Sequence, residues 1–251
     1  MTDAAPLTVT RVRHALKRRL LQVRSVASVT PHLKRVTLAG EDLADFVSAS
    51  FDDHVKVFFP NPGETKPALG EGDEKPIMRD FTPRRFDASA RELDLEFVLH
   101  HPGPASQWAE TAAPGQWLGI GGPRGSFVIP TGFDWHWLIG DDSALPAIAR
   151  RLEELPAGAK VTVIVEAPAR VEFATRTELT SIWVERDGLE AAVHDVPLPA
   201  GEGYIWAAGE ASSIRALRKS LVETRGWPKT RIRAAAYWRR GEAAVHENYE
   251  D

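Results

Sequence analysis

Residues 135–155 read WHWLIGDDSALPAIARRLEEL and decide the fold of the second half of the chain. A short apolar run comes first, as expected for a buried strand. Apolar side chains then recur at helical spacing, at Leu145, Ile148, Leu152 and Leu155. Pro146 fits the first turn of this helix, where the N–H that it lacks would have no partner. The stretch therefore predicts a strand, a turn and a helix in succession.

The same order of elements continues toward the C-terminus. VTVIVEA at 161–167 is a nearly continuous β-branched run, typical of a parallel strand that is covered on both faces. YIWAAG at 204–209 predicts another strand, followed by a helix that Ser212 or Ser213 can cap and Gly226 can end. IRAAAYW at 232–238 predicts a last strand. We therefore expect an α/β domain with a parallel sheet over 132–251.

Toward the N-terminus the pattern changes to short alternating runs. Apolar positions alternate in 25–38, in HVKVFF at 54–59 and in LDLEFVL at 93–99, which predicts antiparallel strands. The Pro-, Gly- and charge-rich interval 61–76 predicts an exposed loop. The fold class is thus an antiparallel β-barrel domain over 1–131 followed by the α/β domain, with the junction near 130–134.

Composition excludes several classes of protein. The 251 residues contain no Cys, which excludes disulfides, Fe–S clusters, Cys-ligated zinc and thiol nucleophiles. The net charge of −4, from 31 basic and 35 acidic residues, gives no reason to expect a nucleic-acid partner. The start of the chain lacks the pattern of a signal peptide, and no apolar run is long enough to span a membrane, so we expect a cytoplasmic protein.

The stretch RDFTPR at 79–84 carries the first candidate chemistry. An arginine suits a phosphate, an aromatic ring stacks on a planar heterocycle, and a threonine hydroxyl can bond a ring nitrogen. Together, Arg79, Phe81 and Thr82 match a flavin nucleotide. Alone, the pattern fits an ordinary edge strand equally well.

Two further turns contain small residues suited to phosphate. GPASQW at 103–108 follows a strand and leads into a short helix, whose first amides can approach a diphosphate. GGPRGS at 121–126 is either a second such turn or the crossing that closes the barrel, and the structural interpretation is preferred. In the second domain, GDDS at 140–143 and GEAS at 209–212 follow strands, where open α/β sheets bind ligands.

Seven ordered motifs resemble the siderophore-interacting proteins, flavin-dependent ferric-siderophore reductases of the ferredoxin-reductase superfamily. They are DDHVKVFFP at 52–60, RDFTPRRFD at 79–87, HHPGPASQWA at 100–109, GPRGSF at 122–127, GDDSALPAIARRLE at 140–153, WAAGEASSIRALR at 206–218 and AAYWRRGE at 235–242. The resemblance implies an FAD-binding barrel followed by a nicotinamide-nucleotide-binding domain.

The resemblance assigns roles at the flavin. Arg79 matches the family's diphosphate-binding arginine, and Phe81 and Thr82 match the stacking aromatic and the hydroxyl beside flavin N5, which makes these two the expected catalytic residues. The aromatic is more often Tyr in the family. The FAD diphosphate is expected at a turn whose residues are His100, Gly103, Ala105, Ser106 and Trp108. The histidine is a departure from the family's glycine-rich turn.

The resemblance also implies a nucleotide site. Its expected residues are Gly140, Asp141, Ser143 and Ala144, with Leu145 and Pro146 behind them, and Gly209 and Glu210, where related reductases often have Cys-Gly. The diphosphate is expected on the helix amides. Glu166 at a strand end favours NADH, whereas Arg170, Arg176 or Arg186 favours NADPH. Both donors stay open, and the resemblance points to NADPH.

For the substrate, an anionic ferric chelate, the expected ligands are Lys56, Arg239 and Arg240, with surface ion pairs as the alternative for each. Tyr237 or Trp238 either shields the flavin or lies in the core. No residue is assigned to a resident metal.

The expected function is electron transfer from NADPH or NADH through FAD to a ferric siderophore, with Fe(II) released. One alternative is a flavin oxidoreductase whose acceptor is a quinone or a protein. The other is a non-catalytic flavin- or siderophore-binding module. We expect a monomer without nucleic-acid or membrane partners, and a ferredoxin-like electron donor is a further candidate partner.

Overall fold

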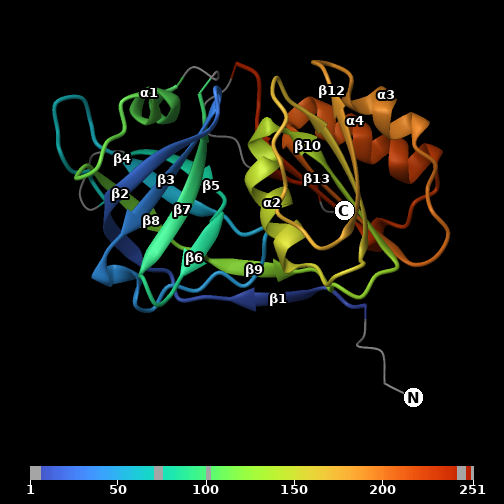
Figure 1. The fold of residues 1–251 in the computed structure, drawn as a ribbon, viewed down its shortest axis with the longest axis horizontal. Helices are drawn as coiled ribbons and strands as arrows, with labels where there is room; N and C mark the ends of the chain where they lie inside the picture. The colour runs from blue at the N-terminus through green and yellow to red at the C-terminus, as the bar shows by residue number, and fades with distance from the viewer. Residues whose placement is uncertain (1–6, 71–75, 100–102, 242–246, 250–251) are drawn as a thin grey trace. The chain divides into compact units, whose positions relative to one another are not determined.

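The structure, a computed structural model, describes residues 7–70, 76–99, 103–241 and 247–249 (Figure 1). The chain forms two compact units: Val9–Ile129, and Pro130–Asp251 together with Met1–Thr8. Leu7 belongs to the second unit because its carbonyl oxygen accepts a hydrogen bond from Arg231 Nη1 at 3.2 Å. The first unit is antiparallel and the second contains a parallel sheet, so the predicted fold class is confirmed.

The described residues of the first unit contain one seven-stranded antiparallel sheet, in the order β5-β4-β8-β2-β3-β7-β6. The bounds are β2 Arg18–Thr30, β3 Leu33–Ala39, β4 Val55–Phe59, β5 Ile77–Phe81, β6 Arg85–Asp87, β7 Glu92–Val98 and β8 Trp117–Gly121. A separate pair, β1 (Thr10–Arg13) and β9 (Gly125–Val128), and the helix α1 (Pro104–Glu110) complete the unit, with a single 3₁₀ turn at Glu41–Leu43.

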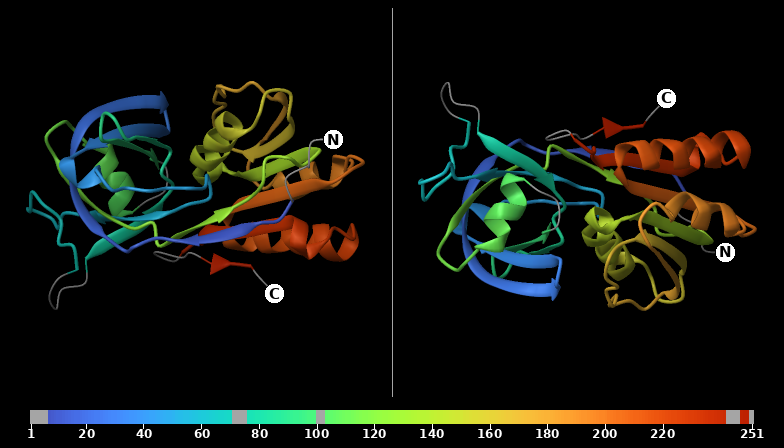
Figure 2. Two further views of the ribbon diagram at one scale, coloured as in Figure 1. Left: turned by 90° about the horizontal axis from the view of Figure 1, so that it is seen from below. Right: turned by 90° about the horizontal axis from the view of Figure 1, so that it is seen from above.

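The two edges of this sheet are joined by a very short link. β5 and β6 lie at opposite ends of the strand order, yet only residues 82–84 separate them in the chain. So short a link spans at most about 14 Å, and the sheet must therefore curl until the end of β5 and the start of β6 lie within this distance. The curled sheet is visible in both views of Figure 2. Its inner face is apolar and includes Leu21, Val36, Val57, Leu95 and Phe97.

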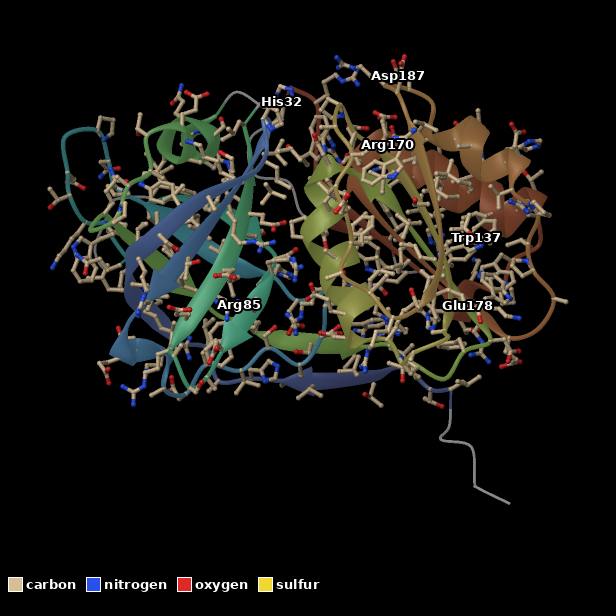
Figure 3. All side chains as sticks on the ribbon, in the orientation of Figure 1. His32, Arg85, Trp137, Arg170, Glu178 and Asp187 are labelled. Carbon is tan, nitrogen blue, oxygen red and sulfur yellow. The ribbon has the colours of Figure 1, made fainter. Side chains whose placement is uncertain are left out.

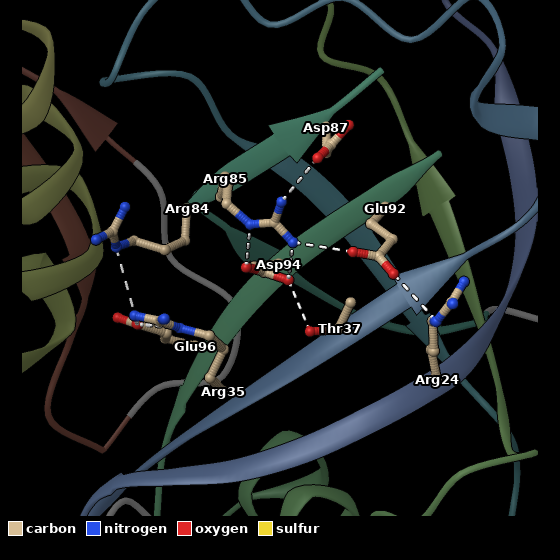
Figure 4. Close-up of polar contacts among 9 residues, drawn as sticks. All are labelled: Arg24, Arg35, Thr37, Arg84, Arg85, Asp87, Glu92, Asp94 and Glu96. Atoms are coloured by element: carbon tan, nitrogen blue, oxygen red, sulfur yellow. Dashed lines mark hydrogen bonds and ion pairs between the residues drawn. The ribbon is translucent and has the colours of Figure 1, made fainter. Parts of the chain in front are cut away.

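The outer face of β7 is buried as well, although it is polar. Asp94 and Glu96 are only 3% and 6% exposed. Asp94 accepts hydrogen bonds from Arg85 Nε and Thr37 Oγ1, each at 2.7 Å, and Glu96 accepts one from Arg35 Nη2 at 2.6 Å (Figure 4). These charge-assisted bonds tie β7 to β6 on one side and to β3 on the other.

We predict that Asp94→Ala destabilises the protein by about 2 kcal/mol, because Arg85 and Thr37 lose their shared acceptor. Urea unfolding followed by circular dichroism measures the loss. Glu41→Ala is the control, since Glu41 also pairs with an arginine but its side chain is 88% exposed, and we expect a change below about 0.5 kcal/mol. Equal losses in the two variants would contradict this account of the outer face.

The described residues of the second unit form a sheet of order β12-β11-β10-β13-β14-β15, parallel except for β15. The strands are β10 Trp135–Asp141, β11 Lys160–Glu166, β12 Glu178–Val184, β13 Gly203–Glu210, β14 Ile232–Trp238 and β15 Glu247–Asn248. The helices are α2 Leu145–Glu154, α3 Leu189–Asp195 and α4 Ala211–Lys219, with short turns at Asp142–Ala144 and Lys229–Arg231 and a π-helical segment at Ser220–Thr224.

Helices cover both faces of this sheet (Figure 2). Trp135, Trp137 and Ile139 of β10 face α3 and α4, where they pack in one cluster with residues such as Leu189 and Ile214. Trp137 lies inside the unit in Figure 3. The alternate side chains of β10 face α2, whose predicted helical stripe is confirmed, because all four of its apolar members are buried.

The sequence analysis missed three elements of this unit. β12 and α3 were not predicted, and β14 is not the last strand, because β15 pairs with it in antiparallel orientation. β11 and β12 are parallel, yet an irregular segment joins them in place of a helix. Gly226 lies after α4 with φ of 68°, as expected of a residue that ends a helix.

Within the described ranges, none of the helices combines the length and the apolar character that crossing a bilayer requires.

Candidate functional site

The first candidate segment lies where β5 runs into the short link between the sheet edges. Arg79 pairs with Val57 and Phe81 with Val55 across β4. The Phe81 ring is half-buried and lies 4.5 Å from the Phe97 ring, centroid to centroid. One part of the ring therefore packs on the barrel core, and the remainder stays exposed.

Arg79 and Thr82 keep polar groups available at this segment. Arg79 donates through Nη1 to the carbonyl oxygen of Met78 at 2.7 Å, and in the described part of the chain it has no carboxylate partner. Thr82 is 7% exposed, and among the described residues its hydroxyl makes no hydrogen bond. Arg84 differs, because it is buried and lies 3.8 Å from Glu96. Of the two arginines in the motif, only Arg79 thus remains suited to a ligand.

The turn before α1 is the second candidate segment. Gly103 is the N-cap residue, and no side chain caps the helix. The first amides of α1 therefore lack acceptors within the helix. The Ser106 hydroxyl donates to the carbonyl oxygen of Gly103 at 3.0 Å, and the Trp108 ring packs 5.5 Å from the Phe97 ring. Trp108 thus packs at the edge of the apolar core. His100, which was also expected at this turn, lies outside the described residues.

We predict that Gly103→Ala weakens FAD binding about tenfold without destabilising the fold. A Cβ at Gly103 would meet no atom within 4 Å, and the extended backbone suits any residue, so the fold tolerates it. The methyl group would, however, hinder a diphosphate that approaches the backbone. Fluorescence titration of the apoprotein with FAD and a melting curve measure the two effects. An unchanged FAD affinity would remove this turn from the site.

The turn 121–126 has a structural role. The Ser126 hydroxyl donates to Asp53 Oδ2 at 2.8 Å and lies 2.7 Å from His14 Nε2. It thereby ties β9 to the segment before β4 and to the chain after β1, which fits the barrel-closing interpretation.

Lys56 forms an ion pair. Its ammonium group lies 2.8 Å from Asp80 Oδ1 on the neighbouring strand β5, and the Lys56 side chain is 46% exposed. This contact is the surface ion pair that the sequence analysis gave as the alternative role of Lys56. Because it is exposed, it contributes little to stability, and Lys56 can still contact an anion from solvent.

In the second unit, the predicted turns meet at the switch point of the parallel sheet. β11 lies on one side of β10 and β13 on the other, so the chain turns in opposite directions from neighbouring strand ends. The strands approach closely here: a Cβ at Gly140 would lie 2.3 Å from the Ala208 carbonyl oxygen, and one at Gly209 would lie 2.6 Å from Asp141 Oδ2. Only glycine fits at these two positions.

The carboxylate of Asp141 lies at this switch point. Oδ1 accepts a bond from the Ser143 amide at 3.0 Å, and Oδ2 accepts bonds from the Glu210 amide and Trp238 Nε1, each at 2.8 Å. Burial raises the pKa of Asp141 to about 6, and the nearby charge of Asp142 acts in the same direction, against the effect of these bonds. The carboxylate joins the ends of three neighbouring strands, β10, β13 and β14.

Glu210 caps α4, a role that the sequence analysis wrongly gave to Ser212 or Ser213. Its Oε2 accepts bonds from the amides of Ser212 at 2.7 Å and Ser213 at 3.1 Å. Burial raises the pKa of Glu210, but the hydrogen bonds from Ser212, Ser213 and Arg240 outweigh it and hold the pKa below its usual value. Because these amides already bind a carboxylate, the start of α4 offers them to no diphosphate.

Asp141 predicts a distinctive pH dependence of stability. Its pKa is higher in the folded than in the unfolded chain, so between about pH 4 and 6 the folded state binds more protons and stability falls as pH rises. We expect Asp141→Asn to lose this contribution, so that its unfolding free energy rises more steeply over this range than that of the wild type. Urea unfolding at pH 4, 5 and 6 measures both slopes, and parallel slopes would contradict the raised pKa.

Glu166, the residue that would favour NADH, is bonded to backbone. Its carboxylate accepts bonds from the amides of Asp187, in the turn before α3, and of Leu189, the first residue of α3, and burial raises the pKa of Glu166. Arg170, Arg176 and Arg186 are all exposed. Asp187 and Arg170 lie at the end of the unit opposite Glu178, the first residue of β12 (Figure 3). The arginines that would favour NADPH therefore lie in solvent-exposed loops.

The turn after β14 carries the other two candidate cations. The Arg240 amide donates to Glu210 Oε1 at 3.3 Å, and its exposed guanidinium lies 3.9 Å from Asp187. Arg239 is half-buried. Trp238 reaches Asp141 as described, and the Tyr237 ring lies 6.3 Å from the Trp206 ring in an edge-on arrangement.

Sequence reasoning missed that Asp141, Glu210 and Trp238 form one hydrogen-bonded group. Asp141 and Trp238 are far apart in the chain, so no spacing rule connects them. The signal available was that both lie at carboxyl ends of predicted parallel strands, which meet at one edge of a sheet. Over the described ranges, no group of three or more acids and histidines has the arrangement of a metal site.

Comparisons with known proteins place both units in one family. Residues 22–127 match the siderophore-interacting FAD-binding domain, and residues 133–241 match the siderophore-interacting protein family. The chain is 37% identical to ferric vibriobactin reductase ViuB of Vibrio cholerae, over 91% of this chain and 93% of the relative. It is 34% identical to the NADPH-dependent ferric-chelate reductase of Escherichia coli K12, over 91% and 95%.

Two solved structures are similar over nearly their whole length. A siderophore utilization protein from T. fusca is 38% identical with a TM-score of 0.87, covering 94% of this chain and 98% of that one. The siderophore-interacting protein SipS from Aeromonas hydrophila is 32% identical with a TM-score of 0.79, covering 92% and 94%.

Proposed function

The chain belongs to the siderophore-interacting protein family, and on this premise we propose that it is an FAD-dependent reductase of ferric siderophores. The observation that carries the proposal is the similarity to two relatives named as ferric reductases, which extends over 91% of this chain. The products are Fe(II) and the free chelator, because hard oxygen ligands hold the less charged Fe(II) more weakly.

The residues of the first unit fit FAD. Arg79 supplies guanidinium donors that no described carboxylate engages, which suits a diphosphate. Thr82 supplies a hydroxyl without a described partner, and Phe81 a partly exposed ring beside it. The uncapped start of α1 adds backbone amides. We therefore assign FAD to the unit Val9–Ile129 and the nicotinamide nucleotide to the unit that begins at Pro130.

Bound FAD supplies the step between a two-electron hydride donor and one-electron ferric acceptors. No general base is required of the protein. Arg79 would bind the FAD diphosphate, Phe81 would pack on the flavin ring and Thr82 would donate a hydrogen bond to that ring. The protein's contribution is therefore to hold and orient the cofactor, and Phe81 in place of the usual Tyr keeps the ring contact without the phenol hydroxyl.

We propose NADPH as the donor. Glu166 would discriminate against a 2′-phosphate, but its carboxylate is bonded to the amides of Asp187 and Leu189. Exposed Arg170, Arg176 and Arg186 follow in the same unit and attract such a phosphate. The relative from Escherichia coli is named as NADPH-dependent.

An anaerobic absorbance titration tests the function. The FAD-loaded protein is titrated with NADH and with NADPH, and a ferric catecholate or a ferric hydroxamate is then added with an Fe(II) chelator as indicator. We expect flavin bleaching, with NADPH preferred, followed by reoxidation and Fe(II) formation. Bleaching by neither nucleotide would indicate a protein donor such as a ferredoxin. Bleaching without Fe(II) formation would favour a quinone or protein acceptor. Failure to bind flavin would favour a non-catalytic siderophore-binding module.

We predict that Thr82→Ala keeps FAD bound but slows flavin reduction about tenfold, the effect of losing one hydrogen bond to the reacting ring. Anaerobic stopped-flow bleaching measures the rate. Thr82→Ser retains the hydroxyl and serves as the control, with a rate near that of the wild type. An unchanged rate in Thr82→Ala would show that Thr82 does not contact the reacting part of the flavin.

We predict that Lys56→Ala weakens binding of an anionic ferric catecholate about fivefold and that of a neutral hydroxamate less. The matched variant Asp80→Asn removes the ion-pair partner at 2.8 Å and should strengthen binding of the anionic chelate. Dissociation constants in low salt measure both effects. Equal changes for the two chelates would leave Lys56 with the surface ion pair alone.

The remaining parts of the proposal concern partners and location. A monomer in the cytoplasm fits a reductase that uses a dissolved nicotinamide nucleotide, and Arg239 and Arg240 complete the cationic candidates for the chelate. Size-exclusion chromatography with light scattering tests whether the protein is a monomer, and cell fractionation tests whether it is cytoplasmic.

A further inference from the structure

One carboxylate reaches the turn that follows the last parallel strand. β14 ends at Trp238, whose indole N–H donates to Asp141 Oδ2 at 2.8 Å, and the same oxygen accepts the Glu210 amide. A bulge between β13 and β14 pairs Gly209 with Ala236 and Glu210 with Trp238. The extra residue changes the direction of the chain here, and the hydrogen bond from the Trp238 indole to Asp141 holds the chain in that direction.

A second carboxylate holds the next part of this turn. Glu210 Oε2 binds the amides at the start of α4, and its other oxygen accepts the Arg240 amide at 3.3 Å. The residues 238–240 are therefore attached at both ends, through Trp238 to Asp141 and through Arg240 to Glu210. We call this segment the 238–240 turn.

The Asp141 carboxylate is buried, and its ionisation is unfavourable there. It is 8% exposed, and burial and Asp142 raise its pKa to about 6. At neutral pH the ionised carboxylate therefore carries a desolvation cost, which the hydrogen bonds from Ser143, Glu210 and Trp238 offset in part. Groups that cost stability in this way are found mainly where function needs them. What this one holds is the turn that carries two arginines at the carboxyl end of the sheet, where ligands bind.

We propose that Asp141 and Glu210 are positioning residues that hold the 238–240 turn so that Arg239 and Arg240 meet the anionic ferric chelate. The inference rests on the proposed function for the identity of the ligand. The described contacts leave the Arg240 guanidinium largely exposed, with Asp187 3.9 Å away as its partner, and both side chains are more than 60% exposed. A fixed backbone thus presents a cation that is little engaged within the chain.

Trp238→Phe and Glu210→Gln test the attachment at its two ends. The first keeps a ring but removes the N–H that binds Asp141. The second keeps an oxygen for the cap of α4 and turns an NH₂ group toward the Arg240 amide, where no acceptor remains. Trp227→Phe is the matched control, because Trp227 also donates an indole bond at 2.9 Å, to the Arg231 carbonyl oxygen of the same unit.

Amide hydrogen exchange of the FAD-loaded protein is the first measurement. We expect the Arg240 amide to exchange about fivefold to tenfold faster in Trp238→Phe and in Glu210→Gln, and at the wild-type rate in Trp227→Phe. Unchanged exchange of Arg240 in the first two variants overturns the positioning role, whatever the reductase assay gives. Equal acceleration in the control overturns it too, since a general loss of stability would then be the cause.

Binding of Ga(III) chelates is the second measurement, because Ga(III) keeps the charge of Fe(III) and is not reduced. We expect Trp238→Phe and Glu210→Gln to weaken binding of an anionic Ga(III) tris-catecholate about threefold to tenfold, and of a neutral Ga(III) hydroxamate less. Wild-type affinity in both variants, or equal losses for both chelates, overturns the role in substrate binding.

The two proposals fail in different ways. A wild-type protein that binds FAD but reduces no ferric chelate overturns the proposed function and, with it, the ligand named here. A wild-type protein that reduces ferric chelates, with variants whose KM for the anionic chelate is unchanged, overturns only the positioning role.

Discussion

The three-residue link between β5 and β6 is the constraint on which the first unit depends. These strands are the two edges of a seven-stranded sheet, and a link this short forces the edges together. The apolar face of every strand then points into one core, although in the described residues β5 pairs only with β4 and β6 only with β7. The link also begins with Thr82 and follows Phe81, so the closure of the sheet and the candidate flavin contacts use the same residues. This explains how Thr82 is buried and yet without a partner among the described residues.

In the second unit, the central interaction is between carboxylates and the backbone amides at the strand ends. The ends of β10 and β13 bring together the starts of helices, which favour negative charge. In many nucleotide-binding sheets a phosphate neutralises such amides. Here the Glu210 carboxylate binds the first amides of α4, and Asp141 binds the Ser143 amide in the turn before α2. The first amides of α2 have no side-chain cap, so they suit the diphosphate of the proposed nucleotide, and the exposed arginines of the loops after β11 and β12 are the proposed partners of a 2′-phosphate.

Apolar periodicity was sufficient to predict the class of both units, because each element buries one stripe or face and the spacing of apolar residues reports it. The helix with Leu145, Ile148, Leu152 and Leu155 shows this. β12 was missed because it is only partly covered, with a mixture of exposed and half-buried residues and no clean period. Contacts between distant segments were also beyond prediction: Lys56 with Asp80 depends on strand register, and Trp238 with Asp141 on the order of strands in the sheet.

The error over the cap of α4 shows why residue type alone does not settle such roles. Ser212 and Ser213 are both good caps, but a cap must stand outside the helix, where its side chain can turn back toward the first amides. Glu210 is in extended conformation at that point, with φ of −61° and ψ of 132°, and its longer side chain reaches the amides of both serines. Because a carboxylate has two oxygens, Glu210 can bind the helix with one and the Arg240 amide with the other. A serine cap would end α4 equally well but would leave the 238–240 turn unattached, so the choice of Glu is explained by the turn and not by the helix.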